Sequence, residues 1–440
     1  MKLKVDTLII NALVVTMDEG GRIMPGAAVA VDSGTILEIG DSRDMSARYE
    51  AGATIDASNA IVMPGLINTH SHLATAMFRG AAEDMALEPW LRAAWAREKA
   101  MVDRETVALS SRLAMLELMM GGVTCAVDMY WYPEATAAAA QKAGFRLAAG
   151  PVFIAGDGLP DGLSLSGRER FAAEFLDRFS GDPLIVPMLM PHSTLTDSPE
   201  LLSRVKRLAE GYGVMVNLHS AETLAERSEV LARHGKTPIR LLRDLGFLDG
   251  RTLLAHCVHV DDEEIALLAG GSAGGGAAVS HNPMSNLKLA SGIAPLAKMA
   301  DAGVRLSLGT DGALSGNDLD MWLAMRLCAV LQKCENRDAT LFKAETVVRM
   351  ATIEAARAIG LGDKIGSLEA GKRADIIIID LDAPHLTPLY DIYAQLLYAA
   401  GREDVATVLI DGRIVMRDRK PTTIDYRESI DTLKALSARA

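Results

Sequence analysis

The histidines of this sequence gather where short apolar segments end, and that placement predicts a metal-binding site. His70 and His72 form an H-x-H pair at the end of one such segment. Residues two apart on a strand project from the same face, so both imidazoles can reach one ion. His219 and Asp311 end two later apolar segments. We predict that these four side chains bind one divalent metal ion.

The predicted ligands are three imidazoles and one carboxylate without a thiolate, which favours Zn²⁺ and leaves Fe²⁺, Co²⁺ and Mn²⁺ open. A catalytic ion of this kind keeps a position for water and lowers the pKa of that water toward neutrality. Glu222 follows His219 by three residues, in the loop beyond the strand end. It is either a solvated glutamate that opens the next helix or a carboxylate that moves protons between water and substrate. Beside a metal site we favour the catalytic role.

The remaining histidines divide into two groups. Those at or just beyond the ends of other apolar segments are His192, His256, His281 and His259. We expect His259 to have a structural role, with support of the site from behind the ligands as the alternative. His234 and His385 lie outside this pattern and are predicted to be structural.

Eight apolar segments, most of them separated by segments with helical spacing, must position these side chains. They cover residues 61–69, 123–128, 146–153, 184–190, 214–218, 252–256, 277–280 and 305–309. Asp103 and Ser198 are predicted to cap helices that end before Gly121 and at Gly211. Eight strands that alternate with helices form a (β/α)₈ TIM-like barrel, in which all carboxyl ends of the strands meet at one rim.

Both ends of the chain differ in pattern from the middle: they consist of short segments rich in Val, Ile and Thr between turns. Asp411-Gly412 is a hairpin signal between two of the C-terminal segments. We therefore predict a small β-sandwich domain formed from residues 1–60 and 361–440, around a catalytic barrel of residues 61–360. The glycine-rich segment 270–276 is predicted to be a flexible connector.

Bulk composition excludes several classes of protein. The formal net charge is −12, which argues against a nucleic-acid surface or a basic face that binds membranes. The four cysteines form no C-x-x-C pair, so neither a disulfide framework nor a thiolate zinc site is indicated. The N-terminal apolar run is interrupted by Asp6 and Asn11 and resembles a strand more than a signal peptide. These features predict a soluble cytoplasmic protein.

Several motifs resemble the aminohydrolase branch of the amidohydrolase superfamily, over nearly the whole chain. They are 64–72 (PGLINTHSH), 78–80 (FRG), Glu83-Asp84, 88–91 (EPWL), 256–259 (HCVH), 280–283 (SHNP), 308–312 (LGTDG) and 371–375 (GKRAD). The branch includes deaminases of purine nucleosides, guanine and pterins, and the triazine hydrolases. The resemblance implies that Glu222 protonates the ring nitrogen while it accepts the water proton. It implies that His256 orients the hydroxide and, with Asp311, relays the second proton. The residues expected to contact the substrate are His192, His281, Trp90 and Ser315.

Methylthioadenosine/S-adenosylhomocysteine deaminases are the members that this sequence resembles in particular, through 286–289 (NLKL), 317–321 (NDLDM) and Gln332-Lys333. Such members tend to carry a ribose-contacting acid near position 99 and an arginine near 151, where this chain has Glu98-Lys99 and Pro151. Arg146, Arg168 and Arg170 are the candidates to compensate. The expected reaction is hydrolytic deamination of a 6-aminopurine nucleoside such as methylthioadenosine, S-adenosylhomocysteine or adenosine. The alternatives are a pterin, guanine-like or triazine substrate, or a metal-binding barrel without catalysis. By resemblance, a homo-oligomer is also expected.

Overall fold

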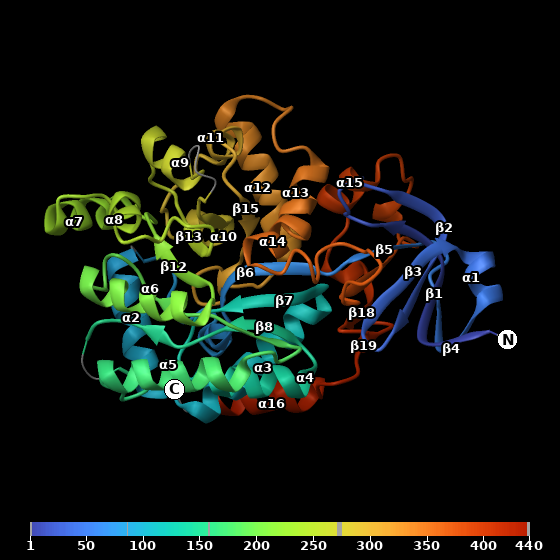
Figure 1. The fold of residues 1–440 in the computed structure, drawn as a ribbon, viewed down its shortest axis with the longest axis horizontal. Helices are drawn as coiled ribbons and strands as arrows, with labels where there is room; N and C mark the ends of the chain where they lie inside the picture. The colour runs from blue at the N-terminus through green and yellow to red at the C-terminus, as the bar shows by residue number, and fades with distance from the viewer. Residues whose placement is uncertain (1, 86, 157–158, 271–274, 438–440) are drawn as a thin grey trace.

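The computed structural model describes residues 2–85, 87–156, 159–270 and 275–437. Two units are visible in Figure 1: a barrel surrounded by helices, and a smaller sheet that contains the N-terminus. The predicted fold class is confirmed, since the parallel strands of the barrel alternate with helices and the small sheet combines both ends of the chain.

The barrel consists of eight parallel strands, three of which are interrupted. In chain order they are β6 (Leu66–His72), β7 (Val123–Asp128), β8 (Arg146–Ala149) with β9 (Val152–Phe153), β10 (Ile185–Pro187) with β11 (Met190–Pro191), β12 (Val216–Ser220), β13 (Thr252–His256), β14 (Ala278–His281), and β15 (Leu306–Leu308) with β16 (Asp311–Gly312). Hydrogen bonds join β10, β8, β7, β6 and β16 in one arc and β12 to β15 in the other. Isolated bridges from residues 189 and 193 to β12 connect the two arcs, and β15 continues into β16, so the ring closes.

Helices cover the outside of the barrel. They include α2 (Leu87–Met101), α3 (Arg104–Met120), α4 (Pro133–Ala143), α5 (Leu165–Phe179), α6 (Pro199–Tyr212), α7 (Leu224–His234), α8 (Pro238–Asp244), α9 (Asp262–Leu268), α10 (Pro283–Lys288), α11 (Leu296–Asp301), α12 (Met321–Asn336), α13 (Ala344–Met350) and α14 (Ile353–Ala358), with the 3₁₀ helix η1 (Leu73–Phe78) directly after β6. Within the described residues, no helix is both long and apolar enough to cross a bilayer.

The two helix starts expected from the sequence are confirmed. Asp103 caps α3 in a capping box with Thr106, and the Ser198 hydroxyl accepts a hydrogen bond from a backbone N–H of α6. The predicted end of α6 at Gly211 is wrong by two residues. The helix ends at Gly213, whose φ of 68° provides the left-handed conformation that closes a helix C-terminus.

The small sheet contains nine strands among the described residues. They are β1 (Leu3–Val15), β2 (Ile23–Asp32), β3 (Thr35–Asp41), β4 (Tyr49–Asp56), β5 (Ala60–Pro64), β17 (Ile376–Asp380), β18 (Val405–Ile410), β19 (Arg413–Arg417) and β20 (Lys420–Pro421), with helix α1 (Ser42–Arg48) before β4. One hydrophobic cluster joins β1 to β5 with β17 and β18, which gives the domain its sandwich-like core from both termini. Asp411 and Gly412 both have positive φ and form the predicted hairpin turn.

The chain passes between the two units at Gly65. The segment 61–69 was expected to be a single strand, but its first part, β5, pairs with β1 and β17 of the small sheet, and β6 begins the barrel. The N–H of Gly65 donates to the carbonyl of Asp375, and a Cβ on Gly65 would lie 2.2 Å from the side chain of Thr124. This close approach requires glycine. The domain limits at residues 60 and 361 stay predictions.

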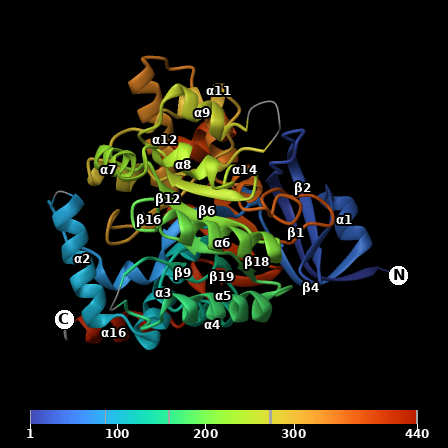
Figure 2. The same ribbon diagram turned by 60° about the vertical axis from the view of Figure 1, so that its left-hand side comes forward.

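A buried ion network ties the barrel to the small sheet. The guanidinium of Arg146, on β8, donates to Asp375 at 2.7 and 2.9 Å and to Asp411 at 3.0 Å. The C-terminal helix α16 (Tyr426–Ser437) also returns to the barrel and lies against α3, as the two views show (Figures 1 and 2). The two units therefore share a fixed interface.

Candidate active site

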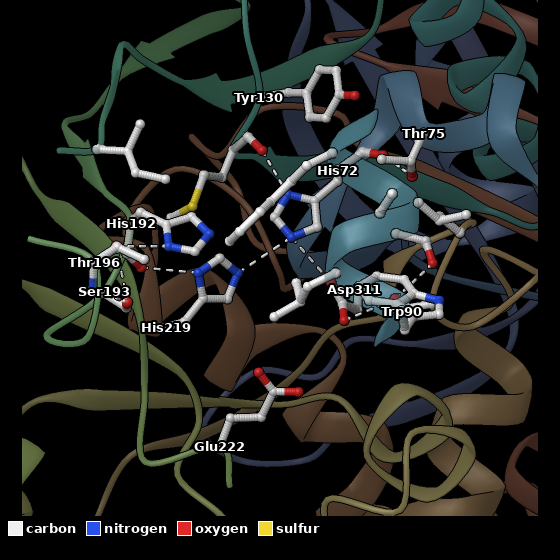
Figure 3. Close-up of a pocket in the computed structure, with 18 of the residues that line it drawn as sticks. His72, Thr75, Trp90, Tyr130, His192, Ser193, Thr196, His219, Glu222 and Asp311 are labelled. Atoms are coloured by element: carbon white, nitrogen blue, oxygen red, sulfur yellow. Dashed lines mark hydrogen bonds and ion pairs between the residues drawn. The ribbon is translucent and has the colours of Figure 1, made fainter. Parts of the chain in front are cut away.

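The four predicted metal ligands meet at the carboxyl rim of the barrel. His70 and His72 lie on β6, His219 on β12 and Asp311 on β16. The Nε2 atom of His72 is 3.3 Å from Nε2 of His219 and 3.1 Å from Oδ1 of Asp311. The Nε2 atom of His70 is 3.6 Å from the same carboxylate oxygen. Figure 3 shows the rings of His72 and His219 edge to edge beside the carboxylate.

Hydrogen bonds from behind fix which nitrogen each imidazole presents. The Nδ1 atom of His72 lies 2.6 Å from the carbonyl oxygen of Met129, and Nδ1 of His219 lies 2.9 Å from that of His192. A carbonyl oxygen only accepts, so both Nδ1 atoms carry the proton. The two Nε2 lone pairs then face each other next to the Asp311 carboxylate. A cation between them is the group that satisfies all three.

The protonation states also suit a metal ion. Burial and the neighbouring histidines hold the pKa of His70 and of His219 well below the usual range, so both rings are neutral. Burial lowers the pKa of His72, but Asp311 beside it raises the value to about 9 overall. Burial raises the pKa of Asp311, yet its bond to His72 outweighs this and the carboxyl is ionised. Neutral His70 and His219 and the ionised Asp311 are in the ligand forms that metals require, and His72 would reach that form when the ion displaces its proton.

Within the described residues, three groups of side chains have ligand atoms close enough to share an ion; one, of His385, Glu403 and Asp404, lies away from this site, and two lie here. These two are His70, His72 and His219, and His70, His256 and Asp311. Nε2 of His70 is fully buried without a hydrogen-bond partner among these residues. The site therefore fits one divalent metal ion.

Glu222 and His256 lie next to this cluster. Oε2 of Glu222 is 3.9 Å from Nε2 of His256, and Oε1 accepts a hydrogen bond from the hydroxyl of Ser291 at 3.3 Å. The Nδ1 atom of His256 is 2.8 Å from Oδ1 of Asn286, which orients the ring so that Nε2 faces Glu222. A carboxylate and an imidazole thus face each other at the rim, as proton transfer requires.

The strand ends at this rim have an unusual backbone. Positive φ angles, which non-glycine residues adopt at a cost of about 1–3 kcal/mol each, occur at Ala221, His256, Cys257 and Asp311. Such strain gathers at functional sites because the surrounding contacts hold it in place. Here these residues lie at or next to three strand ends of the same rim.

Glu226 is a part of the site that the sequence analysis missed. Its carboxylate accepts the backbone N–H of Glu222 at 2.7 Å and that of Ala221 at 3.1 Å. Burial raises the pKa of Glu226 to about 7. The signal in the sequence was an acid four residues after Glu222, which is also the pattern of an ordinary first-turn helix acid.

The metal cluster opens into a cavity whose wall includes three of the four expected substrate contacts. Trp90, His192 and Ser315 line it, and Figure 3 shows His192 next to His219. Burial lowers the pKa of His192 to about 4, so this ring is neutral. The Ser315 hydroxyl donates to Oδ2 of Asp311 at 2.9 Å, so part of its role is to orient that carboxylate.

His281 is placed differently from the expectation. It does not belong to the residues that line the cavity, and it is buried at the end of β14. Burial and the charge of His256 lower its pKa to about 3. A direct contact between His281 and substrate therefore stays a prediction. His259 lies near the site, with its Nε2 2.7 Å from the carbonyl oxygen of Ser291, and both its expected structural role and the alternative of support for the site stay predictions.

The arginines that could have compensated for Pro151 are occupied elsewhere. Arg146 is held in the interface network, and Arg168 pairs with Asp161 and donates to the carbonyl of Val152. Arg170 is exposed on α5. None of the three lines the cavity. Glu98 does line it, with its carboxylate 2.7 Å from the hydroxyl of Tyr130.

Residues 61–415 match the model of the amidohydrolase family. The chain belongs to this family. It is 38% identical to a 5-methylthioadenosine/S-adenosylhomocysteine deaminase of Syntrophobacter fumaroxidans, with 99% of this chain and 98% of the relative covered. It is also 38% identical to a 5′-deoxyadenosine deaminase of Methanosarcina mazei, with 97% and 96% covered.

A solved structure supports the same family assignment. An adenosine deaminase from Xanthomonas campestris with bound zinc superposes with a TM-score of 0.96 at 35% identity and covers 100% of this chain and 99% of its own. The barrel, the sheet from both termini and α16 thus belong to one shared architecture. The resemblance found in the sequence is confirmed.

Proposed function

We propose that this amidohydrolase is a metal-dependent deaminase that hydrolyses the 6-amino group of a purine nucleoside and releases ammonia. Methylthioadenosine, S-adenosylhomocysteine, 5′-deoxyadenosine and adenosine are the candidate substrates. The observation that carries the proposal is the meeting of three imidazoles, Asp311 and the Glu222–His256 pair at the bottom of one cavity. Full-length relatives named as deaminases of such nucleosides support the substrate class.

Zn²⁺ is the metal that we propose for the four ligands. The related adenosine deaminase holds zinc, and a set of imidazoles with one carboxylate suits this ion. When bound, the ion supplies a water of lowered pKa as nucleophile and stabilises the negative charge that develops. The proposal includes Fe²⁺, Co²⁺ and Mn²⁺ as ions that the same ligands accept.

The residues beside the ligands have separate tasks in the proposed reaction. Glu222 takes a proton from the attacking water and delivers it to N1 of the purine, which makes C6 more electrophilic. Water adds to C6, and His256 holds the incoming oxygen in line through its Nε2. Asp311 and His256 pass the second water proton toward the amino group. The C6–N bond then breaks, and the products are the 6-oxopurine and ammonia.

The cavity wall would hold the rest of the nucleoside. Trp90 offers an aromatic face for the purine, and neutral His192 can donate to or accept from a ring or sugar atom. Glu98 is the carboxylate in the wall that suits the vicinal ribose hydroxyls, because an ionised carboxylate accepts two hydrogen bonds. Its place in the cavity wall beside Tyr130 supports Glu98 as the ribose-contacting acid that the family pattern puts near residue 99.

We further propose that the protein works in the cytoplasm as a homo-oligomer and without a nucleic-acid partner. Four free cysteines among the described residues, three of them buried, suit a reducing compartment. The acidic balance of the chain supports the absence of a nucleic-acid partner. The oligomeric state can be checked by light scattering during gel filtration.

The proposed function is tested by ammonia release from the zinc-loaded full-length protein. The panel contains adenosine, 5′-deoxyadenosine, methylthioadenosine, guanine, a pterin and a triazine. We expect turnover of the nucleosides, its loss after chelation and its return with Zn²⁺. Turnover of the pterin or triazine alone would contradict the proposal, and no ammonia from any compound would favour a barrel without catalysis.

A further inference from the structure

The cavity wall beyond the metal cluster is apolar and carries no positive charge. It contains three tryptophans and several aliphatic side chains, among them Trp90, Leu91, Trp95, Ile154, Leu195 and Leu314. Trp95 is 46% exposed, which places this residue at the mouth of the cavity. In the part of the chain that the structure describes, no lysine or arginine lines the cavity. The part of a bound substrate that lies away from the metal cluster therefore contacts an apolar surface.

The titratable side chains of the wall, apart from its histidines and Tyr130, are carboxyl groups. They are Glu98, Glu222, Glu226 and Asp311. Three cations on segments next to the cavity have partners outside it. Arg168 lies behind the ring of Trp131, 5.5 Å from its centre, and pairs with Asp161. Lys288 pairs with Glu83 and donates to Asn317, and Arg227 pairs with Asp261 and Glu264.

We propose that the site prefers nucleosides whose 5′ substituent is small and uncharged, such as 5′-deoxy or 5′-methylthio, and discriminates against a charged 5′ substituent. This inference rests on the proposed function, because C6 of the purine must lie at the metal end for the 5′ carbon to point toward the apolar wall. The homocysteine group of S-adenosylhomocysteine would bring a carboxylate to a surface that offers no cation. A 5′-phosphate would meet the same wall with more negative charge.

The physical reason is desolvation without compensation. A carboxylate that leaves water needs a cation or several N–H donors, and a site without them rejects it strongly. A methylthio group, in contrast, loses no hydrogen bonds on entering an apolar surface and gains contact with the tryptophans. The wall should therefore bind the methylthio tail and disfavour the homocysteine tail. Relatives of both kinds, deaminases of methylthioadenosine and S-adenosylhomocysteine and of 5′-deoxyadenosine, are each 38% identical to this chain, so overall identity does not decide between the two tails.

The test compares kcat/KM of the zinc-loaded protein for four nucleosides that differ in their tail alone. They are 5′-deoxyadenosine, methylthioadenosine, S-adenosylhomocysteine, and a 5′-butylthio analogue that matches the length of the homocysteine tail without its charges. We expect the three uncharged compounds to fall within a few-fold of one another and S-adenosylhomocysteine to be at least ten-fold lower. Equal turnover of S-adenosylhomocysteine would overturn the inference. An equally poor butylthio analogue would also overturn it, because length and not charge would then decide.

A variant pair checks that the tail meets this wall. Leu91→Arg adds a cation to the wall, and Leu91→Gln adds a shorter, neutral polar side chain. We expect the ratio of kcat/KM for S-adenosylhomocysteine to that for the butylthio analogue to rise several-fold in the arginine variant and not in the glutamine variant. An unchanged ratio in both would overturn the placement of the tail. Failure of all the nucleosides to release ammonia would instead contradict the proposed function itself.

Discussion

Replacement of Glu226 should disable the site without removing the metal ligands. This carboxylate is buried and accepts the N–H groups of Ala221 and Glu222, where the backbone of Ala221 has a φ of 51°. Glu226→Gln keeps one acceptor oxygen but turns an NH₂ group toward the other N–H. One buried N–H then loses its partner, which costs about 1–3 kcal/mol. We expect the loop to move so that this N–H finds another partner, and Glu222 to move with the loop.

The expected consequence is a loss of kcat with little change in zinc content. A displacement of about 1 Å at a catalytic group costs on the order of 100-fold in rate, so kcat should fall at least ten-fold. Glu229→Gln is the matched control, since Glu229 lies on the same helix, is half exposed and pairs only with Arg233 among the contacts described. Surface pairs of this kind contribute little. The measurements are ammonia release, zinc per chain and thermal unfolding.

The position of Glu222 is the quantity under test. If Glu226→Gln unfolds with a normal midpoint, holds one zinc and turns over at the wild-type rate, then the bonds to the loop do not position the carboxylate. A fall in zinc content together with kcat would also refute the reasoning, because the effect would then act on the ligands.

Three further predictions follow from the same geometry. Glu222→Gln should bind zinc normally and lose about 100-fold or more in kcat, and normal turnover would contradict its role in proton transfer. Gly309→Ala would place a Cβ 2.9 Å from the backbone nitrogen of His70, so we expect lower zinc affinity in a chelator competition. Arg146→Met leaves the buried Asp375 without its cation, while Asp411 keeps Arg373, and should cost about 3–5 kcal/mol in urea unfolding. Burial raises the pKa of Asp411, but hydrogen bonds from arginines outweigh this and bring the pKa below its usual range. The ionised Asp411 therefore stabilises the fold fully above about pH 4, the pKa of the unfolded chain. This stabilisation is lost as the pH falls through the lower pKa that Asp411 has in the folded protein. Wild type should therefore lose more stability than Arg146→Met on acidification.

The strand ends and the meeting of the four proposed metal ligands could be predicted because their signals are local. An apolar run and the histidine that ends it occupy neighbouring positions in the chain, and the barrel fold brings all such ends to one rim. The two β-rich termini and the hairpin at Asp411-Gly412 were equally local, and both were confirmed. Glycine at position 65 was visible too, but its effect depends on Thr124 and Asp375, which are distant in sequence. The split of one apolar run between two sheets was therefore missed.

The cavity wall could not be predicted for the same reason. Arg168 was a reasonable candidate to bind a substrate tail, since nothing in the neighbouring sequence shows that Asp161 and the Trp131 ring hold it behind the wall. His281 resembles the other strand-end histidines, yet packing leaves it buried outside the cavity. Each of these outcomes depends on which side of a strand end or loop faces the ligand, and distant residues decide that.

The residues with local sequence signals and those without them also differ in their place in the site. The metal ligands lie on strands of the barrel, whereas the wall comes from α2 and from the segments that follow β9, β11 and β16, at Leu91, Ile154, Leu195 and Leu314. Strands are held by their neighbours on both sides, while loops tolerate substitution. The chemistry of the reaction is therefore fixed by the barrel, and the choice of tail is set by positions that can change without disturbing the ligands. Substitutions at these wall positions should accordingly alter the ratio of kcat/KM between nucleosides while zinc content stays constant.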